Sequence, residues 1–352
     1  MNDPQLHWPS VLTQLLAGED LTEERAAQVM GALMRGDAES AQVAGLLVGL
    51  RAKGESPAEI TGFVRAMLDA AVPVSVPDHL AGSLVDIVGT GGDGAGTFNI
   101  STVAALVVAA AGVPVAKHGN RAASSRCGSA DLLEAWGVEI ELSPAAVVRC
   151  LEEINLTFLY ARSFHPAMRH VAPVRQQLGV RTVFNLLGPL SNPAHVPYQA
   201  VGVADARMAP IMADALARLG RRHALVFRGE DGLDELTTTG ESQLWEIRDG
   251  TVTVRRFAPE EVGLARATPA DLAGGDAAAN VAIAERILAG GQGPAADIVA
   301  LNAAAALFAA DAVPDLAAGV QRSRQVLADG AARALKDRWV ETSRRLAEPR
   351  GG

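Results

Sequence analysis

The stretch LVDIVGTGGDGAGTFNIST, residues 84–102, decides the fold of this chain, and a second stretch, VAKHGNRAASSRCGS at 115–129, repeats its design. In each, a short apolar run typical of a β-strand ends in a loop, and a helical pattern follows. Such a junction offers free backbone N–H groups and the positive end of a helix dipole to an anion. Five glycines between 89 and 96 let the backbone approach a phosphate closely. We therefore expect the two loops to hold a large, highly phosphorylated small molecule between them.

The segment before the first loop has the pattern of helices alone. Over residues 4–71, apolar side chains recur at three- and four-residue spacing, Ser56-Pro57 marks a helix start, and Gly18, Gly36 and Gly54 mark breaks. This predicts a small all-helical domain of about four helices. Residues 72–83 hold two prolines and no helical period, which predicts a linker or hinge. We place the helical domain at 1–75, joined by helices near 166–182, and a larger domain at 76–352.

Strand-like and helix-like segments alternate after residue 84. We predict strands at 84–88, 113–116, 157–160, 198–203 and 224–228, and helices at 101–111, 129–136, 143–154, 167–178 and 208–219. The alternation predicts an α/β domain with a mainly parallel central sheet covered on both faces, and a ligand at the carboxyl ends of its strands. Residues 243–247 and 251–257 resemble a hairpin, and alanine-rich helix follows from residue 276.

Composition excludes several classes of function. A net charge of −9 opposes a protein that coats DNA, RNA or an anionic membrane. Cys127 and Cys150 have neither metal-ligand nor disulfide-framework spacing, which favours a reducing compartment. The first residues lack the pattern of a signal peptide, and the longest apolar stretch, Val103–Ala116, is too short to span a bilayer. We therefore expect a cytoplasmic protein.

The glycine-rich loop does not fit the common nucleotide motifs. Gly89, Gly91 and Gly94 match a dinucleotide fingerprint, but that site needs an acidic residue about 20 positions later, where Lys117 and His118 stand instead. A Gly-Lys-Ser/Thr motif is also absent from the loop. One alternative is a glycine-rich turn without a ligand. The polar side chains in and after the loop favour a polyphosphate with its metal instead; they are Asp93, Thr97, Asn99, Ser101 and Thr102.

The second loop adds positive charge and hydroxyl groups. Lys117 and Arg121 are two cations that follow the second predicted strand, and Ser124, Ser125 and Ser129 add hydroxyls. A cluster of charges is often only a solvated surface. The glycines around it, and an anion loop one βα unit earlier, favour a phosphate site.

Five motifs in order resemble the anthranilate phosphoribosyltransferase family. They are GTGGD…NIST (89–102), KHGNR…SS…GSAD (117–131), HPAMR…VR (165–175), FNLLGPLSNP (184–193) and DGLDEL (231–236). The likeness runs from the N-terminal helices to the end of the chain. It implies a small helical domain with a large α/β domain, a homodimer, and 5-phosphoribosyl-1-diphosphate (PRPP) as co-substrate with Mg²⁺, two ions in the substrate complex.

The resemblance also implies roles for residues at matching positions. PRPP is expected to contact Gly89, Gly92, Asp93, Thr97, Asn99, Ile100, Ser101, Thr102, Lys117, His118, Gly119, Asn120, Arg121, Ala122, Ala123, Ser124, Ser125 and Ser129. Anthranilate is expected to meet Asn120 and Arg175, inside a channel walled by His118, His165 and Gly188. The residues expected to serve catalysis are Lys117, Asn120 and Arg175. Ser101 is expected at one Mg²⁺, and Asp234 with Glu235 at a second.

Elementary chemistry supports these roles, although each has a simpler alternative. A guanidinium grips a flat carboxylate with two parallel hydrogen bonds, yet Arg175 alone resembles a surface arginine of the predicted helix 167–178. His165 before a proline is equally an ordinary helix start. Asp234-Glu235 is either an acidic turn or a pair of the hard oxygen ligands that Mg²⁺ prefers.

The sequence departs from the family pattern at three positions. Arg126-Cys127 stands where the family more often has Lys-Ser, so the charge is kept and a hydroxyl is replaced by a thiol. A thiol on a cationic loop is expected to have a lowered pKa. Met168 stands where some relatives carry an aromatic residue, which alters the expected channel.

The expected reaction joins the amine of anthranilate to C1 of the ribose and releases pyrophosphate, in the second step of tryptophan biosynthesis from chorismate. An aromatic amine is already a nucleophile at neutral pH, so we assign no general base. Closure about residues 72–83 would exclude water. A pyrimidine nucleoside phosphorylase shares this architecture and a similar basic loop and is the nearest rival. A non-catalytic relative that binds nucleic acid is a second, opposed by the net charge of −9.

Overall fold

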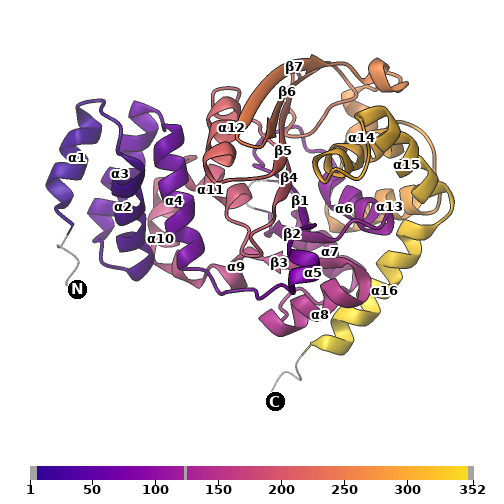
Figure 1. The fold of residues 1–352 in the computed structure, drawn as a ribbon, viewed down its shortest axis with the longest axis horizontal. Coiled ribbons are helices and arrows are strands. Elements are labelled where there is room, and N and C mark those ends of the chain that lie inside the picture. The colour runs from indigo at the N-terminus through magenta and orange to yellow at the C-terminus, as the bar shows by residue number, and fades with distance from the viewer. Residues whose placement is uncertain (1–5, 123–124, 348–352) are drawn as a thin grey trace.

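The N-terminal part of the chain is a bundle of helices, as the sequence predicts. The computed structural model describes residues 6–122 and 125–347. Four helices come first, and Figure 1 shows them at one end of the molecule: α1 (Trp8–Leu16), α2 (Glu23–Arg35), α3 (Ser40–Lys53) and α4 (Pro57–Asp69). Ser56 caps α4 with its side chain, and Pro57 takes the first helical position. A later helix, α10 (Ala172–Leu178), packs against α3 and so extends the bundle.

A seven-stranded sheet forms the centre of the α/β part, in the order β3-β2-β1-β4-β5-β6-β7. The strands are β1 (Val85–Gly89), β2 (Val115–Gly119), β3 (Leu156–Tyr160), β4 (Tyr198–Gly202), β5 (His223–Gly229), β6 (Ser242–Arg248) and β7 (Thr251–Phe257). Strands β1 to β5 are parallel, and β6 and β7 add an antiparallel hairpin. The order reverses between β1 and β4, where a crevice opens at the carboxyl ends of an α/β sheet.

Helices cover both faces of this sheet. The remaining α-helices are α5 (Asp78–Ala81), α6 (Ile100–Ala110), α7 (Ser129–Trp136), α8 (Pro144–Ile154), α9 (Ala161–Phe164), α11 (Phe184–Leu190), α12 (Met208–Arg218), α13 (Ala277–Leu288), α14 (Pro294–Ala309), α15 (Leu316–Ala328) and α16 (Ala331–Leu346). One apolar cluster joins α6 and α13–α16 to one face of the sheet. A second joins α11, α12 and the helical bundle to the other face; Figure 1 shows these helices together on one side of the sheet. Because α6 is apolar on all sides, it is buried between the sheet and α14.

Two local predictions were wrong, and the predicted linker holds a short helix that was not expected. The helix expected at 167–178 is a 3₁₀ helix at Pro166–His170 followed by α10, because Pro173 lacks an N–H and fits only the first turn of a helix. The segment 72–83 contains the short helix α5. Strand β2 continues to Gly119, so Lys117 and His118 lie in the strand rather than in the loop after it.

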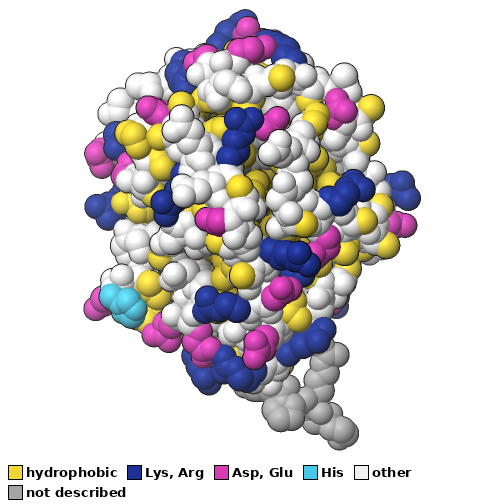
Figure 2. All heavy atoms as spheres, turned by 90° about the vertical axis from the view of Figure 1, so that its right-hand side faces the viewer, with side chains coloured by type: hydrophobic (Ala, Val, Ile, Leu, Met, Phe, Trp, Pro, Cys, Tyr) yellow, Lys and Arg dark blue, Asp and Glu magenta, His cyan; other side chains and the backbone are white. Residues whose placement is uncertain are grey.

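The surface shows no sign of a continuous basic face in the view of Figure 2. On this side, which carries α15 and α16, Lys and Arg side chains alternate with Asp and Glu. Among the described helices, none has the length and apolar character needed to cross a membrane.

Candidate active site

The first loop passes directly over the switch point of the sheet. Gly89 ends β1, and a Cβ there would lie 2.2 Å from Oδ2 of Asp234. Glycine at this position therefore lets the segment around Asp234 lie across the end of the strand. The Gly91 N–H donates to the same Asp234 oxygen at 2.7 Å. The predicted phosphate loop and the predicted metal ligand are thus in direct contact.

Acidic side chains gather at this point. Burial and the nearby Asp93 raise the pKa of Asp234 to about 7. Burial and Asp234 raise the pKa of Glu235 well above its ordinary value, while Lys117 opposes that rise. Like charges so close favour a bound cation or a proton. Within residues 6–122 and 125–347, no three His, Cys, Asp or Glu side chains form a complete metal site by themselves. The residues fit Mg²⁺, which commonly takes one or two carboxylates and completes its shell with water and phosphate oxygens.

Lys117 lies beneath the loops rather than above them. Its Nζ donates to the Ile87 carbonyl at 2.6 Å and to Ser101 Oγ at 3.4 Å, and the side chain is buried. Burial lowers the pKa of Lys117, and Asp86 and Glu235 oppose this shift. The ammonium therefore already has neutral partners and acidic neighbours, and it reaches the loop region from below.

The two loops meet, as the sequence predicts. Asn99 Nδ2 donates to the Cys127 carbonyl at 3.0 Å, and Asn280 Nδ2 donates to Asn99 Oδ1 at 2.8 Å. Thr97 pairs with Ala273 as an isolated β-bridge, which ties the first loop to a later segment.

Two residues predicted to contact PRPP have side chains that face the protein interior. The side chains of Ile100 and Thr102 are buried, and the hydroxyl of Thr102 has no hydrogen-bond partner. Only their backbone groups, at the start of α6, are suited to an anion.

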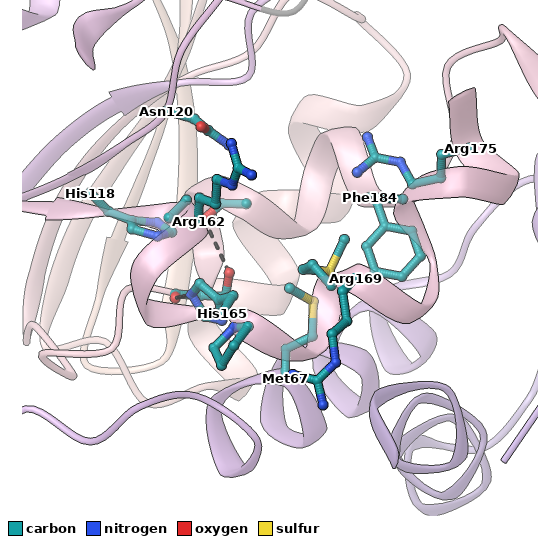
Figure 3. Close-up of a pocket in the computed structure, with 14 residues that line it drawn as sticks. Met67, His118, Asn120, Arg162, His165, Arg169, Arg175 and Phe184 are labelled. Atoms are coloured by element: carbon teal, nitrogen blue, oxygen red, sulfur yellow. Dashed lines mark hydrogen bonds between the residues drawn. The ribbon is translucent and has the colours of Figure 1, made fainter. Parts of the chain in front are cut away.

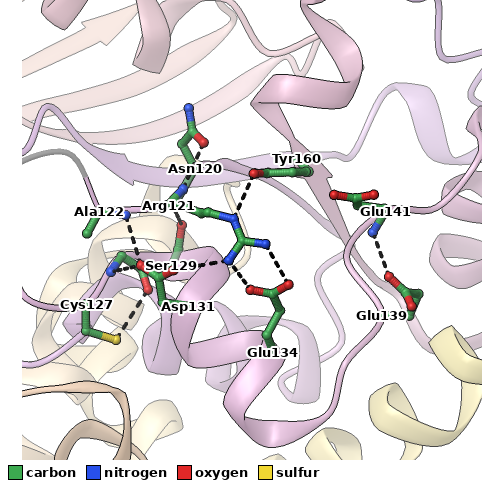
Figure 4. Close-up of polar contacts among 11 residues, drawn as sticks. Asn120, Arg121, Ala122, Cys127, Ser129, Asp131, Glu134, Glu139, Glu141 and Tyr160 are labelled. Carbon is green, nitrogen blue, oxygen red and sulfur yellow. Dashed lines mark hydrogen bonds and ion pairs between the residues drawn. The ribbon is translucent and has the colours of Figure 1, made fainter. Parts of the chain in front are cut away.

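The second loop is fixed by acids of α7 (Figure 4). Asp131 Oδ2 accepts hydrogen bonds from the N–H groups of Ala122 at 2.9 Å and Gly128 at 2.8 Å. Ser129 Oγ donates to the Asn120 carbonyl at 3.1 Å. Ala123 and Ser124 lie outside the described residues, and Ser125 Oγ donates to the Cys127 carbonyl at 3.4 Å.

The Arg121 side chain already pairs with acidic and polar side chains of the protein. Figure 4 shows its guanidinium between Glu134 and Tyr160. It pairs with both oxygens of Glu134, at 2.8 Å for Nη2, and its Nε donates to the Tyr160 hydroxyl at 3.1 Å. Asp131 lies 3.4 Å from Nη1. The positive charge expected to hold phosphate is therefore already neutralised.

The thiol of Cys127 has a raised pKa, so the expectation of a lowered one was wrong. Burial is the largest cause, and the carboxylates of Asp131 and Asp276 add to it. The sequence suggested a cationic loop, but the folded chain surrounds this thiol with acids.

A pocket of about 620 Å³ lies between the helical bundle and the second loop (Figure 3). It is lined by Met67, His118, Asn120, Ala161, Arg162, His165, Pro166, Met168, Arg169, Ala172, Arg175, Phe184, Gly188 and Ser191. Arg175 lies with Cζ 5.2 Å from the centre of the Phe184 ring. Burial lowers the pKa of Arg175, and none of the ion pairs among the described residues includes it. An uncompensated guanidinium in a mixed apolar pocket suits a flat carboxylate.

Two neutral histidines form one wall of the pocket. His118 Nδ1 lies 3.1 Å from the Gly188 carbonyl, and His165 Nε2 lies 2.9 Å from the Ser191 carbonyl. Burial lowers the pKa of His118 to about 3 and that of His165 to about 4. Both rings are therefore uncharged at neutral pH. With its Nδ1–H on a carbonyl, His118 has a lone pair on Nε2, an atom that is buried without a partner.

The chain is similar throughout to transferases of known structure. The models described as "Glycosyl transferase family, a/b domain" and "Glycosyl transferase family, helical bundle domain" match residues 81–333 and 9–71. The anthranilate phosphoribosyltransferase of Salinispora arenicola is 50% identical over 341 residues, 96% of each chain. That of Thermomicrobium roseum is 51% identical over 342 residues, 96% of this chain and 98% of its own. The chain belongs to the anthranilate phosphoribosyltransferase family.

Solved structures of this family have the same fold. The enzyme from Thermus thermophilus is 52% identical, with a TM-score of 0.89 over 95% of this chain and 99% of its own. The enzyme from Saccharomyces cerevisiae, solved in complex with PRPP and Mg, is 27% identical, with a TM-score of 0.87 over 96% and 98%. Anthranilate phosphoribosyltransferases are pentosyltransferases of tryptophan biosynthesis, and the helical and α/β parts predicted here are those of the family.

The GPLSNP motif of the family supports the pocket wall. The carbonyls of Gly188 and Ser191 face the two histidines, and Gln199 Nε2 donates to the Pro189 carbonyl at 3.0 Å. Asn192 Nδ2 donates to Asp86 Oδ2 at 2.9 Å. The motif is therefore the end of α11 and the residues after it, and buried polar side chains hold its backbone oxygens.

The sequence analysis missed several residues of the site. Asp86 accepts a hydrogen bond from the His118 N–H at 3.1 Å, and burial raises its pKa to about 6. An acid inside the apolar run 84–88 was a signal that it has a buried role. Arg162 and Arg169 line the pocket, and both lie beside the HPAM motif. Arg181, which contacts the first loop, carried no signal that we recognised.

Proposed function

We propose that this chain transfers the phosphoribosyl group of PRPP to the amine of anthranilate, giving N-(5-phosphoribosyl)anthranilate and pyrophosphate. The observation that carries the proposal is the unpaired guanidinium of Arg175, in a pocket that shares Asn120 with the second loop and His118 with strand β2. A carboxylate held there places its aromatic ring in the pocket beside the loops that bind phosphate. Proximity of the two substrates supplies much of the catalysis.

The acceptor pocket combines one charged side chain with uncharged walls. Arg175 binds the carboxylate of anthranilate in a bidentate pair, and Asn120 contacts its polar edge. The neutral rings of His118 and His165 bring no positive charge near the amine. The neutral His118 ring, with its Nδ1 on the Gly188 carbonyl, forms part of the wall, and the nitrogen lone pair of the amine stays free to attack C1 of the ribose.

The donor substrate lies on the two loops with its metal. Asp234, Glu235 and Ser101 would hold Mg²⁺ beside the diphosphate, and we expect two ions in the substrate complex. When bound, the metal neutralises charge that develops on the leaving pyrophosphate. Backbone N–H groups of the first loop hold the phosphates, and Lys117 adds positive charge from beneath.

The outer face of the helical bundle supports a homodimer. Leu16 of α1 is 82% exposed and Val48 of α3 is 51% exposed, and these two helices are in contact. We propose that a second copy of the chain covers this face, which light scattering would report as twice the chain mass. The free thiols of Cys127 and Cys150 support work in the reducing cytoplasm.

The test follows the fluorescence of anthranilate in a mixture with PRPP, Mg²⁺ and the protein. We expect the fluorescence to fall, and to stay constant without PRPP. Inorganic phosphate with thymidine or uridine is the parallel reaction for the nucleoside phosphorylase alternative. Cleavage of either nucleoside, with no change in anthranilate, would overturn the proposal.

A further inference from the structure

Arg181 lies on the first loop although 90 residues separate it from Gly91. It belongs to the short connection between α10 and α11. Both Nη1 and Nη2 donate to the Gly91 carbonyl, each at 3.1 Å. A Cβ added to Gly92, whose φ is +75°, would lie 1.4 Å from Arg181 Nη1. The guanidinium therefore rests against the loop backbone, in space that only glycine at 92 leaves open.

The charge of Arg181 has no acidic partner among the described residues. None of the ion pairs formed by residues 6–122 and 125–347 includes this guanidinium. One neutral carbonyl shared by two N–H groups is a weak partner for a group that can bind phosphate with two parallel hydrogen bonds. The guanidinium of Arg181 can therefore still bind an anion at the loop.

The two cations that the sequence offered for phosphate already have hydrogen-bond partners within the protein. Lys117 is buried and bonded to the Ile87 carbonyl, and Arg121 is paired with Glu134. A diphosphate on the first loop would also face Asp234 and its acidic neighbours. A further positive group on the open side of the loop would offset that repulsion, and Arg181 occupies this position.

We propose that Arg181 binds the diphosphate of PRPP, its guanidinium exchanging the Gly91 carbonyl for phosphate oxygens when Mg²⁺–PRPP binds. This inference rests on the proposed function and adds a residue to its donor site. Arg181 is also three residues before Phe184, the ring that supports Arg175. One short connection therefore presents a cation to the donor and shapes the pocket for the acceptor.

The test compares Arg181→Gln with wild type. Glutamine keeps an uncharged N–H donor on a shorter side chain and removes the charge. Binding of Mg²⁺–PRPP is measured by calorimetry without anthranilate, and both KM values are measured by fluorescence. We expect the Kd and KM for PRPP to rise by about 10- to 100-fold, from the loss of a charge-assisted pair. The KM for anthranilate should stay within about twofold, because Arg175 is unchanged.

The matched control is Arg322→Gln. Arg322 also donates to a single backbone carbonyl, that of Ala111 at 3.2 Å, but it lies on α15 away from the site. It should leave both substrates unaffected. If Arg181→Gln fails to fold, as judged by circular dichroism, Arg181→Met is measured in the same way with the same expectation.

Two outcomes would overturn the inference. An unchanged PRPP affinity in the folded variant would reduce Arg181 to a structural support of the loop. A rise confined to the KM for anthranilate would assign Arg181 to the acceptor pocket. A different result would refute the proposed function. If the wild-type protein binds Mg²⁺–PRPP in the calorimeter but does not consume anthranilate, the proposed reaction is wrong, while the comparison of PRPP affinities still tests Arg181.

Discussion

Replacing Arg175 by methionine should abolish tight binding of the acceptor without weakening the fold. The guanidinium is partly buried with its Cζ 5.2 Å from the Phe184 ring centre, and burial lowers its pKa. A hydrogen-bonded pair with a carboxylate contributes about 1.5–3 kcal/mol, so the KM for anthranilate should rise by about 10- to 150-fold. The lost stacking costs about 0.5–1 kcal/mol of stability, and relief of the buried charge offsets it.

The assay measures anthranilate fluorescence at saturating Mg²⁺ and PRPP, with urea unfolding as the stability readout. Arg222→Met is the matched control, because Arg222 also lies over an aromatic ring, with Cζ 5.7 Å from the centre of Tyr198, and it is remote from the pocket. We expect the control to match wild type in both KM values. An unchanged KM for anthranilate in Arg175→Met, or an equal rise in the KM for PRPP, would refute the reasoning.

Three further predictions concern metal, thiol and scaffold. Because the pKa of Asp234 is raised to about 7, its carboxylate takes up a proton below that pH, so the Mg²⁺ concentration needed for half-maximal activity should rise when the pH falls from 8 to 6. The double variant Asp234→Asn with Glu235→Gln should lose activity at low Mg²⁺. A Mg²⁺ titration of this variant identical to that of wild type would contradict the metal assignment. Cys127, with its raised pKa, should react with iodoacetamide at pH 8 more slowly than a free thiol, which mass spectrometry would report. Asp86→Asn should lower the free energy of unfolding, measured in urea, by about 1–3 kcal/mol. The Asp86 carboxylate accepts one hydrogen bond on each oxygen, and the NH₂ of asparagine would face one of those two donors. An unchanged unfolding midpoint would contradict this structural role of Asp86.

The parts of the site that the sequence revealed are those encoded by neighbouring residues. The glycine loop, the strand before it and helix α6 follow one another within 26 residues, from Val85 to Ala110, and their order alone places the loop at the carboxyl end of a strand. The meeting of the two loops follows from the same rule, since β1 and β2 are adjacent parallel strands.

The parts that sequence reasoning missed depend on contacts between distant segments. Arg121 resembled a free cation because Glu134 is 13 residues away, on the far side of a loop. The raised pKa of Cys127 depends first on burial, which only the fold decides, then on Asp131, and least on Asp276, which nothing local in the sequence joins to the second loop. Arg181 reaches Gly91 only because the connection after α10 folds back over the sheet. A sequence shows which residues are charged, but it does not show which distant residues they pair with.

The acids beside the first loop discriminate between the two chemistries that share this architecture. Asp234 and Glu235 raise each other's energy when both are charged, and Asp234 lies on the loop itself through the Gly91 N–H. A free phosphate placed there would meet only repulsion from these carboxylates. A diphosphate that arrives with Mg²⁺ brings the cation that the carboxylates lack, and its oxygens complete a metal site that these residues cannot complete alone. The arrangement therefore favours a diphosphate leaving group over the orthophosphate of a phosphorylase.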